Sequence, residues 1–102
     1  MTPEGKIVAY LLRECKVHGF AVRKLSYEGR VGAPDRLILA YGAAAFVEVK
    51  APGETPRPEQ LREIALLNKS GLFACCVSSK EDVDRLINSI FCLANMARDG
   101  EW

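Results

Sequence analysis

The sequence has little histidine, no paired cysteine motif and no long apolar run, and each shortage excludes a class of protein. His18 is the one histidine, and Cys15, Cys75, Cys76 and Cys92 lack the paired spacing of structural zinc sites. We expect these cysteines to be reduced and mostly buried, as in a cytoplasmic protein. No apolar run is long enough to span a membrane, and no signal peptide is recognisable.

Length and charge indicate what kind of domain the chain forms and what kind of partner suits it. At 102 residues the chain suffices for one compact domain, which we expect over residues 1–98, with a loose tail at residues 99–102. Hydrophobic residues make up 49% of the chain and charged residues 26%, so wholesale disorder is not expected. The net charge of +1 hides an asymmetry, because residues 1–50 carry net +3 and residues 51–102 net −2. This modest basic bias is compatible with a partner that bears phosphate.

Apolar periodicity and turn signals predict an α/β fold in the order helix, three strands, helix, strand, helix. We expect helices at residues 1–17, 58–70 and from Ser79 onward, and strands at residues 20–25, 37–40, 44–47 and 72–77. Strands one to three would form an antiparallel meander, and the middle helix would return strand four parallel to strand three. The result is a four-stranded mixed sheet flanked by helices.

Local signals mark where the helices begin. Thr2 can cap the first helix, whose first position suits Pro3. Ser79, followed three residues later by Asp82, resembles a capping box that opens the last helix. The buried side of the middle helix is expected to carry Leu61, Ile64, Ala65 and Leu67.

The strands at 37–40 and 44–47 read as a β-hairpin whose arms carry Asp35 on one side and Glu48 and Lys50 on the other. If Tyr41-Gly42 forms the centre of the turn, Asp35 lies opposite Glu48; if Gly42-Ala43 does, Asp35 lies opposite Lys50. In both registers the three groups share one face, whereas a three-residue loop would move Glu48 to the other face. Charged groups beside a core are costly, so we expect them to hold a metal or to do chemistry.

Two segments carry a family resemblance. Gly-x-Pro-Asp-Arg at residues 32–36 and Phe-Val-Glu-Val-Lys-Ala-Pro-Gly at residues 46–53, with Gln60 downstream, resemble the VRR-NUC branch of the PD-(D/E)XK nuclease superfamily. The resemblance covers residues 2–88, and the stand-alone, phage-type members are similar in layout. It implies a restriction-endonuclease-like core.

The resemblance also assigns roles residue by residue. Asp35 and Glu48 match the metal-binding acids of the family, and Lys50 matches its catalytic lysine. Gln60 matches the glutamine that opens the next helix, with an ordinary polar residue of a first helical turn as the alternative. Glu4 matches an acid on the first helix that takes part in catalysis and metal binding; the alternative is a charge that only favours the helix start.

The chemistry implied is phosphodiester hydrolysis with Mg²⁺ or Mn²⁺. Asp35, Glu48 and the Val49 backbone carbonyl can supply oxygen ligands to such a cation and leave positions for water and phosphate. Lys50 can orient or deprotonate the attacking water, or stabilise charge on the phosphorane, and the sequence does not decide between these roles. The competing interpretation is a structural ion pair between Lys50 and one of the acids.

Several basic residues are candidates for contacts with DNA phosphates. Lys24 lies where the family often has a lysine near DNA, and Arg23, Arg30 and Arg36 are further candidates. For each of them singly, a solvated surface charge is the alternative. Tyr27, in the loop before the hairpin, is a weaker candidate for stacking on an unpaired base.

The function that the resemblance implies is a structure-specific DNA endonuclease that resolves four-way (Holliday) junctions. We expect it to act as a homodimer, because the last helix is apolar on more than one face and the substrate calls for two symmetric cuts. The location implied is the cytoplasm of a bacterial or phage-infected cell. The alternatives are a flap, nicking or DNA-end-directed nuclease of the same fold, and a non-catalytic DNA-binding or assembly module.

Overall fold

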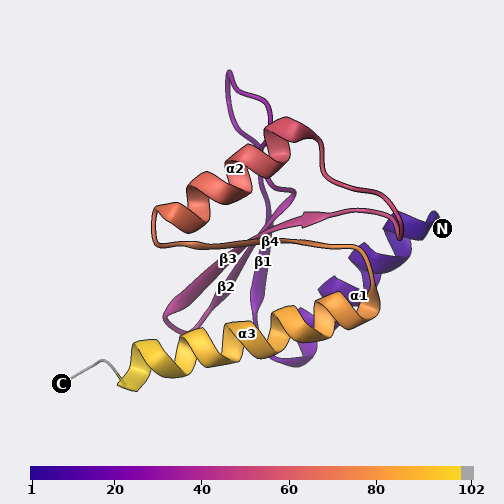
Figure 1. Ribbon diagram of the computed structural model, residues 1–102. Coiled ribbons are helices and arrows are strands. Elements are labelled where there is room, and N and C mark those ends of the chain that lie inside the picture. The colour runs from indigo at the N-terminus through magenta and orange to yellow at the C-terminus, as the bar shows by residue number, and fades with distance from the viewer. Residues whose placement is uncertain (100–102) are drawn as a thin grey trace.

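The computed structural model describes residues 1–99 and has the predicted order of elements (Figure 1). The elements are α1 (Pro3–Val17), β1 (Ala21–Lys24), β2 (Arg36–Ala40), β3 (Ala43–Val49), α2 (Pro58–Lys69), β4 (Phe73–Val77) and α3 (Lys80–Asp99). Asp99 is the last residue of α3, and the rest of the predicted tail, residues 100–102, lies outside the described residues.

The four strands form one mixed sheet in the order β1-β2-β3-β4. Neighbours among the first three strands are antiparallel, and β4 is parallel to β3, as expected for strands joined through a helix. Figure 1 shows α3 running along one side of the sheet and α2 along the other. Helices therefore flank both faces of the predicted α/β core.

The main core lies between the sheet and the two terminal helices. Ala45, Val47 and Val49 of β3 are buried in it, because side chains alternate along a strand. Leu11 of α1 and Val83 of α3 are fully buried against them. Glu48, between the two valines, consequently lies on the opposite face, which α2 partly covers.

Hydrogen bonds at the predicted helix starts confirm the capping signals. The Thr2 hydroxyl accepts a bond from the Gly5 N–H at 3.0 Å, directly before Pro3. The Ser79 hydroxyl accepts a bond from the Asp82 N–H at 3.0 Å. The Asp82 carboxylate in turn accepts a bond from the Ser78 N–H at 2.9 Å, so the start of α3 is bonded in both directions.

The predicted buried side of α2 is right only in part. Ile64 and Leu67 are half-buried, but Leu61 and Ala65 are exposed, and the buried residues of this helix are the polar Gln60 and Glu63. The helix turns a different side toward the sheet than the apolar pattern indicates, because these two side chains have hydrogen-bond partners on the sheet and on the loop before β2. An apolar pattern carries no information about such polar contacts.

The cysteines are free within the described residues, as expected, but only Cys15 is buried. Cys75 and Cys76 are half-buried and Cys92 is exposed, so the expectation of mostly buried thiols was wrong. Over residues 1–99, no helix combines the length and the apolar character needed to cross a membrane.

The Asp82 carboxylate gives the protein a testable dependence on pH. Its backbone hydrogen bond from Ser78 is the largest cause that holds the pKa of Asp82 below its ordinary value. A lowered folded-state pKa contributes stability above the unfolded-state pKa, and this contribution is lost as pH falls toward the folded-state pKa. We therefore expect Asp82→Asn to reduce the free energy of unfolding at pH 7 and to reduce it less at pH 3, measured by urea denaturation.

Glu81→Gln is the matched control, because Glu81 lies in the same first turn of α3 and is exposed. Its effect should be smaller at pH 7. An equal loss of stability for Asp82→Asn at both pH values would contradict the assignment.

Candidate active site

The β2–β3 hairpin has the first of the two predicted registers. Ala40 pairs with Ala43, so Tyr41 and Gly42 are the two central residues of the turn, and Gly42 has a φ of 84° that favours glycine. The last pair of the ladder is Arg36 with Val47. One step further along the same register, Asp35 lies opposite Glu48.

The Glu48 carboxylate is the buried centre of the site, with a side chain that is only 3% exposed. Its Oε2 atom accepts a hydrogen bond from the Gln60 amide at 2.9 Å and lies 3.3 Å from the Lys50 ammonium nitrogen. Its Oε1 atom is buried and has no hydrogen-bond partner within the described part of the chain. One oxygen of the carboxylate is thus satisfied twice, and the other is unsatisfied.

The surroundings make Glu48 difficult to ionise. Burial is the largest cause that raises the pKa of Glu48 above its ordinary value, and the negative charge of Asp35 raises it further. The hydrogen bond and positive charge of Lys50 lower it, and the charge of Glu4 is a small further cause that raises it. A positive charge placed near Oε1 would stabilise the ionised carboxylate.

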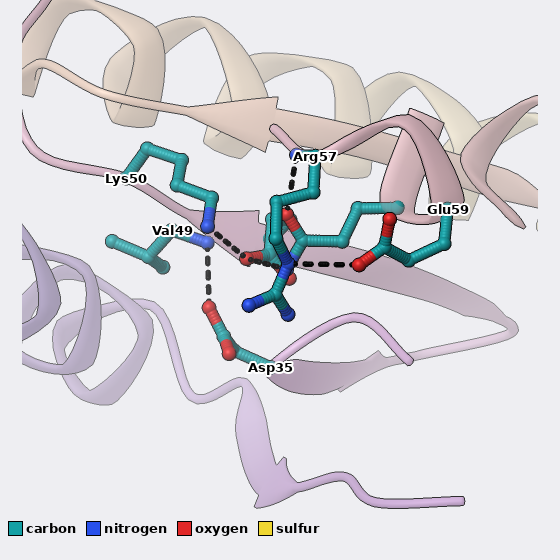
Figure 2. A network of polar contacts seen from close by, with 7 residues as sticks. Asp35, Val49, Lys50, Arg57 and Glu59 are labelled. Carbon is teal, nitrogen blue, oxygen red and sulfur yellow. Dashed lines mark hydrogen bonds and ion pairs between the residues drawn. The ribbon is translucent and has the colours of Figure 1, made fainter. Parts of the chain in front are cut away.

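Gln60 holds Glu48 in place from the first turn of α2. Its Oε1 atom accepts a hydrogen bond from the Arg57 N–H at 2.8 Å, while its amide nitrogen donates to Glu48. Both ends of the amide are therefore used, which fixes its orientation. Figure 2 shows this network with the neighbouring ion pair of Arg57 and Glu59, whose nitrogen and oxygen are 3.0 Å apart.

Asp35 reaches the end of β3 from the bend that precedes β2. Its Oδ2 atom accepts a hydrogen bond from the Val49 N–H at 2.8 Å (Figure 2). Because the N–H and C=O of one strand residue point toward the same neighbouring strand, the Val49 carbonyl also faces the Asp35 side. Asp35, Glu48, the Val49 carbonyl and Lys50 thus meet at one end of the sheet.

These groups fit a hard divalent cation. An unsatisfied, buried carboxylate oxygen opposite a second carboxylate is the donor set that Mg²⁺ or Mn²⁺ prefers. Over residues 1–99, no three His, Cys, Asp or Glu side chains already converge on one point. Mg²⁺ commonly binds through one or two carboxylates together with water and substrate phosphate, so two acids suffice.

Two comparisons with known proteins bear on the family of this chain, although no family model matches it. A phage protein named "Putative nuclease p44", from Acyrthosiphon pisum secondary endosymbiont phage 1, is 48% identical over 65 residues, which are 63% of this chain and 70% of that protein. A solved structure described as a "VRR_NUC domain" matches 86% of this chain and 97% of its own, with 44% identity and a TM-score of 0.80. The chain belongs to the VRR-NUC family. Its element order and mixed sheet are those of the restriction-endonuclease-like fold of VRR-NUC domains.

The predicted residues of this VRR-NUC chain do not all meet at the site. Glu4 is exposed on the first turn of α1 and acts on Glu48 through its charge. Lys24 pairs with Arg36, and Arg36 with the core residue Val47, so Lys24 and Arg36 lie on the sheet face opposite Glu48. Arg23 lies on the same face as Glu48 and is exposed. Their contacts with DNA remain a proposal.

Arg30 is engaged by a residue that the sequence analysis missed. Glu63 of α2 is buried, and its carboxylate accepts hydrogen bonds from the Tyr27 hydroxyl at 2.7 Å and from Arg30 at 3.3 Å. These bonds tie the loop at residues 26–33 to α2. Helical spacing could have pointed to Glu63, because it lies three residues after Gln60 and therefore on the same face of the helix.

The Gln60 bridge can be tested on stability alone. Gln60→Met keeps the volume but removes one of the two partners of the Glu48 Oε2 atom, leaving only Lys50, and leaves the Arg57 N–H without its partner. We expect it to lower the free energy of unfolding by about 1–3 kcal/mol, measured by urea denaturation without added metal.

Leu61→Met, at the next and exposed position of α2, should change stability by less than about 0.5 kcal/mol. Equal stability of Gln60→Met and the wild type would show that the bridge contributes nothing.

Proposed function

We propose that this VRR-NUC protein is a divalent-metal-dependent DNA endonuclease that hydrolyses phosphodiester bonds in four-way junctions. The observation that carries the proposal is the unsatisfied Oε1 atom of buried Glu48, opposite Asp35 at the end of β3. A structural ion pair between Lys50 and Glu48 does not account for this atom, because Lys50 lies against Oε2. The phage relative named "Putative nuclease p44" supports the same activity.

Asp35, Glu48 and the Val49 carbonyl would hold the cation. When bound, Mg²⁺ or Mn²⁺ neutralises charge on the scissile phosphate and makes a water nucleophilic. The choice of these ions follows from the donors, which are all oxygen atoms. Glu4, at the start of α1, adds negative charge near this position.

Gln60 and Lys50 prepare the site in different ways. Gln60 fixes the Glu48 carboxylate so that Oε1 is the atom left for the cation. The Lys50 side chain is 14% exposed, and its ammonium nitrogen lies 3.3 Å from Oε2 of Glu48, on the carboxylate that would hold the cation. There it can stabilise negative charge on the reacting phosphate or orient the attacking water.

DNA cleavage is the direct test of the proposal. We expect Asp35→Asn and Lys50→Ala each to lower the cleavage rate of a four-way junction in Mg²⁺ at least about 100-fold. Asp35→Asn removes a charged ligand of the cation, and Lys50→Ala removes a positive charge beside the reacting phosphate. Junction binding, measured by fluorescence anisotropy, should persist. A chelator should abolish cleavage by the wild type.

Asp84→Asn is the matched control, since it removes an acid of α3 that bonds to Tyr10 away from the site. It should cleave like the wild type. Equal cleavage by wild type and both site variants would indicate a contaminant or another site, and binding without any cleavage would favour a DNA-binding module. Cleavage of flaps, nicked duplex or DNA ends in preference to junctions would identify the other nuclease types.

We also propose that the enzyme acts as a homodimer in the cytoplasm of a bacterial or phage-infected cell. The second half of α3 exposes Phe91 and Met96, and Tyr41 and Leu72 are exposed apolar residues outside this helix. Exposed apolar side chains of this kind favour contact with a second copy. A symmetric dimer would place two sites for the two cuts that a junction requires.

Met96→Lys tests the dimer, because the Met96 side chain is 69% exposed and its replacement should leave the core intact. We expect it to weaken self-association at least about 10-fold in sedimentation equilibrium, since it removes one apolar side chain from the interface. Leu66→Lys, the same change at an exposed position of α2, should have no such effect. A wild type that is monomeric at micromolar concentration and still resolves junctions would refute the homodimer.

A further inference from the structure

A cavity of about 590 Å³ lies between the loop at residues 26–33 and the first half of α2. Figure 1 shows this loop projecting beside α2, away from α3. The cavity is lined by Tyr27, Gly29, Arg30, Val31, Glu59 and Arg62.

The walls of the cavity are held in place by buried groups. The Tyr27 hydroxyl and the Arg30 guanidinium both bond to Glu63, whose side chain is 7% exposed. At Gly32 the φ is +98°, and a Cβ atom would lie 2.8 Å from the Glu59 carbonyl oxygen, so the loop backbone is packed directly against α2. The Tyr27 ring is therefore fixed before any ligand arrives.

The charge of the lining favours an anion. Arg62 has no ion-pair partner among residues 1–99, and the Arg30 side chain is 63% exposed although it bonds to Glu63. The one acid of the lining, Glu59, already pairs with Arg57. Two guanidinium groups beside an aromatic ring are a common means of holding a phosphate and a base together.

The cavity adjoins the candidate active site. Glu59 precedes Gln60, the residue that holds Glu48, and Gly32 lies three residues before Asp35. A DNA strand that places one phosphate at Asp35 and Glu48 would therefore pass the mouth of the cavity with a neighbouring nucleotide.

We propose that the cavity binds one unstacked nucleotide of the DNA substrate, with its phosphate on Arg62 and Arg30 and its base against Tyr27. This proposal depends on the proposed nuclease function and adds to it a reason for acting on branched DNA. A base inside a continuous duplex is stacked and paired, whereas a base at a branch point is readily released. The site would thus select branched DNA by accepting a nucleotide that plain duplex cannot supply.

The test compares binding of a four-way junction and of a plain duplex of equal length, by fluorescence anisotropy in Mg²⁺, in the non-cleaving Asp35→Asn background. Arg62→Ala should weaken junction binding about 5- to 10-fold and duplex binding by less than half that factor. Tyr27→Ala should weaken junction binding about 5- to 100-fold, as for loss of one stacked base. Tyr27→Phe keeps the ring but loses its bond to Glu63, so it should weaken junction binding less than Tyr27→Ala does.

Lys69→Ala is the matched control for charge, because Lys69 is an exposed cation at the other end of α2. Its loss should not change the preference for the junction. Arg62→Ala should not affect folding, because the Arg62 side chain is exposed. Circular dichroism would check that Tyr27→Ala is still folded.

Two results would overturn the proposal: unchanged junction binding by Arg62→Ala, or an equal loss for junction and duplex, which would indicate a general phosphate contact. Cleavage by the protein with intact Asp35 is measured alongside. Wild-type cleavage without any effect of Arg62 or Tyr27 would reject the nucleotide site alone, whereas absent wild-type cleavage would reject the nuclease function.

Discussion

The ionisable carboxylate of Glu48 is buried at the end of β3, and the arrangement around it follows from the cost of keeping it there. A buried carboxylate is stable only if its oxygen atoms are paired. Gln60 and Lys50 satisfy one oxygen, and the second has no hydrogen-bond partner among the described residues. The negative charge of Asp35 disfavours ionisation of Glu48 further. The site is therefore short of positive charge, which a divalent cation would supply.

The sequence could predict the parts of the site that depend on short-range geometry. The sequence left two two-residue turns open around Gly42, and in both of them alternation places Asp35, Glu48 and Lys50 on one face. The structure has the Tyr41-Gly42 turn, in which Asp35 lies opposite Glu48. Thr2 and Ser79 likewise act on residues only three positions away. These features require no knowledge of how the helices pack on the sheet.

The rotation of α2 could not be predicted in the same way. Apolar spacing indicated Leu61 as part of the buried side, yet Gln60 and Glu63 are buried because they bond to groups 12 and 36 residues away in the chain. The same cause explains the position of the loop at residues 26–33, because the Tyr27 hydroxyl bonds to Glu63 of α2. Long-range polar contacts carry no periodic signal, and here they determine where the candidate site and its neighbouring cavity lie.

A crystal soaked in Mn²⁺ would test the central claim most directly, since anomalous scattering locates the ion without any assay of activity. We predict a peak within about 2.5 Å of the Oε1 atom of Glu48 and of the Asp35 carboxylate. A peak elsewhere, or no peak in crystals that hold Mn²⁺ at other positions, would show that the unsatisfied oxygen does not bind a cation and would contradict the account.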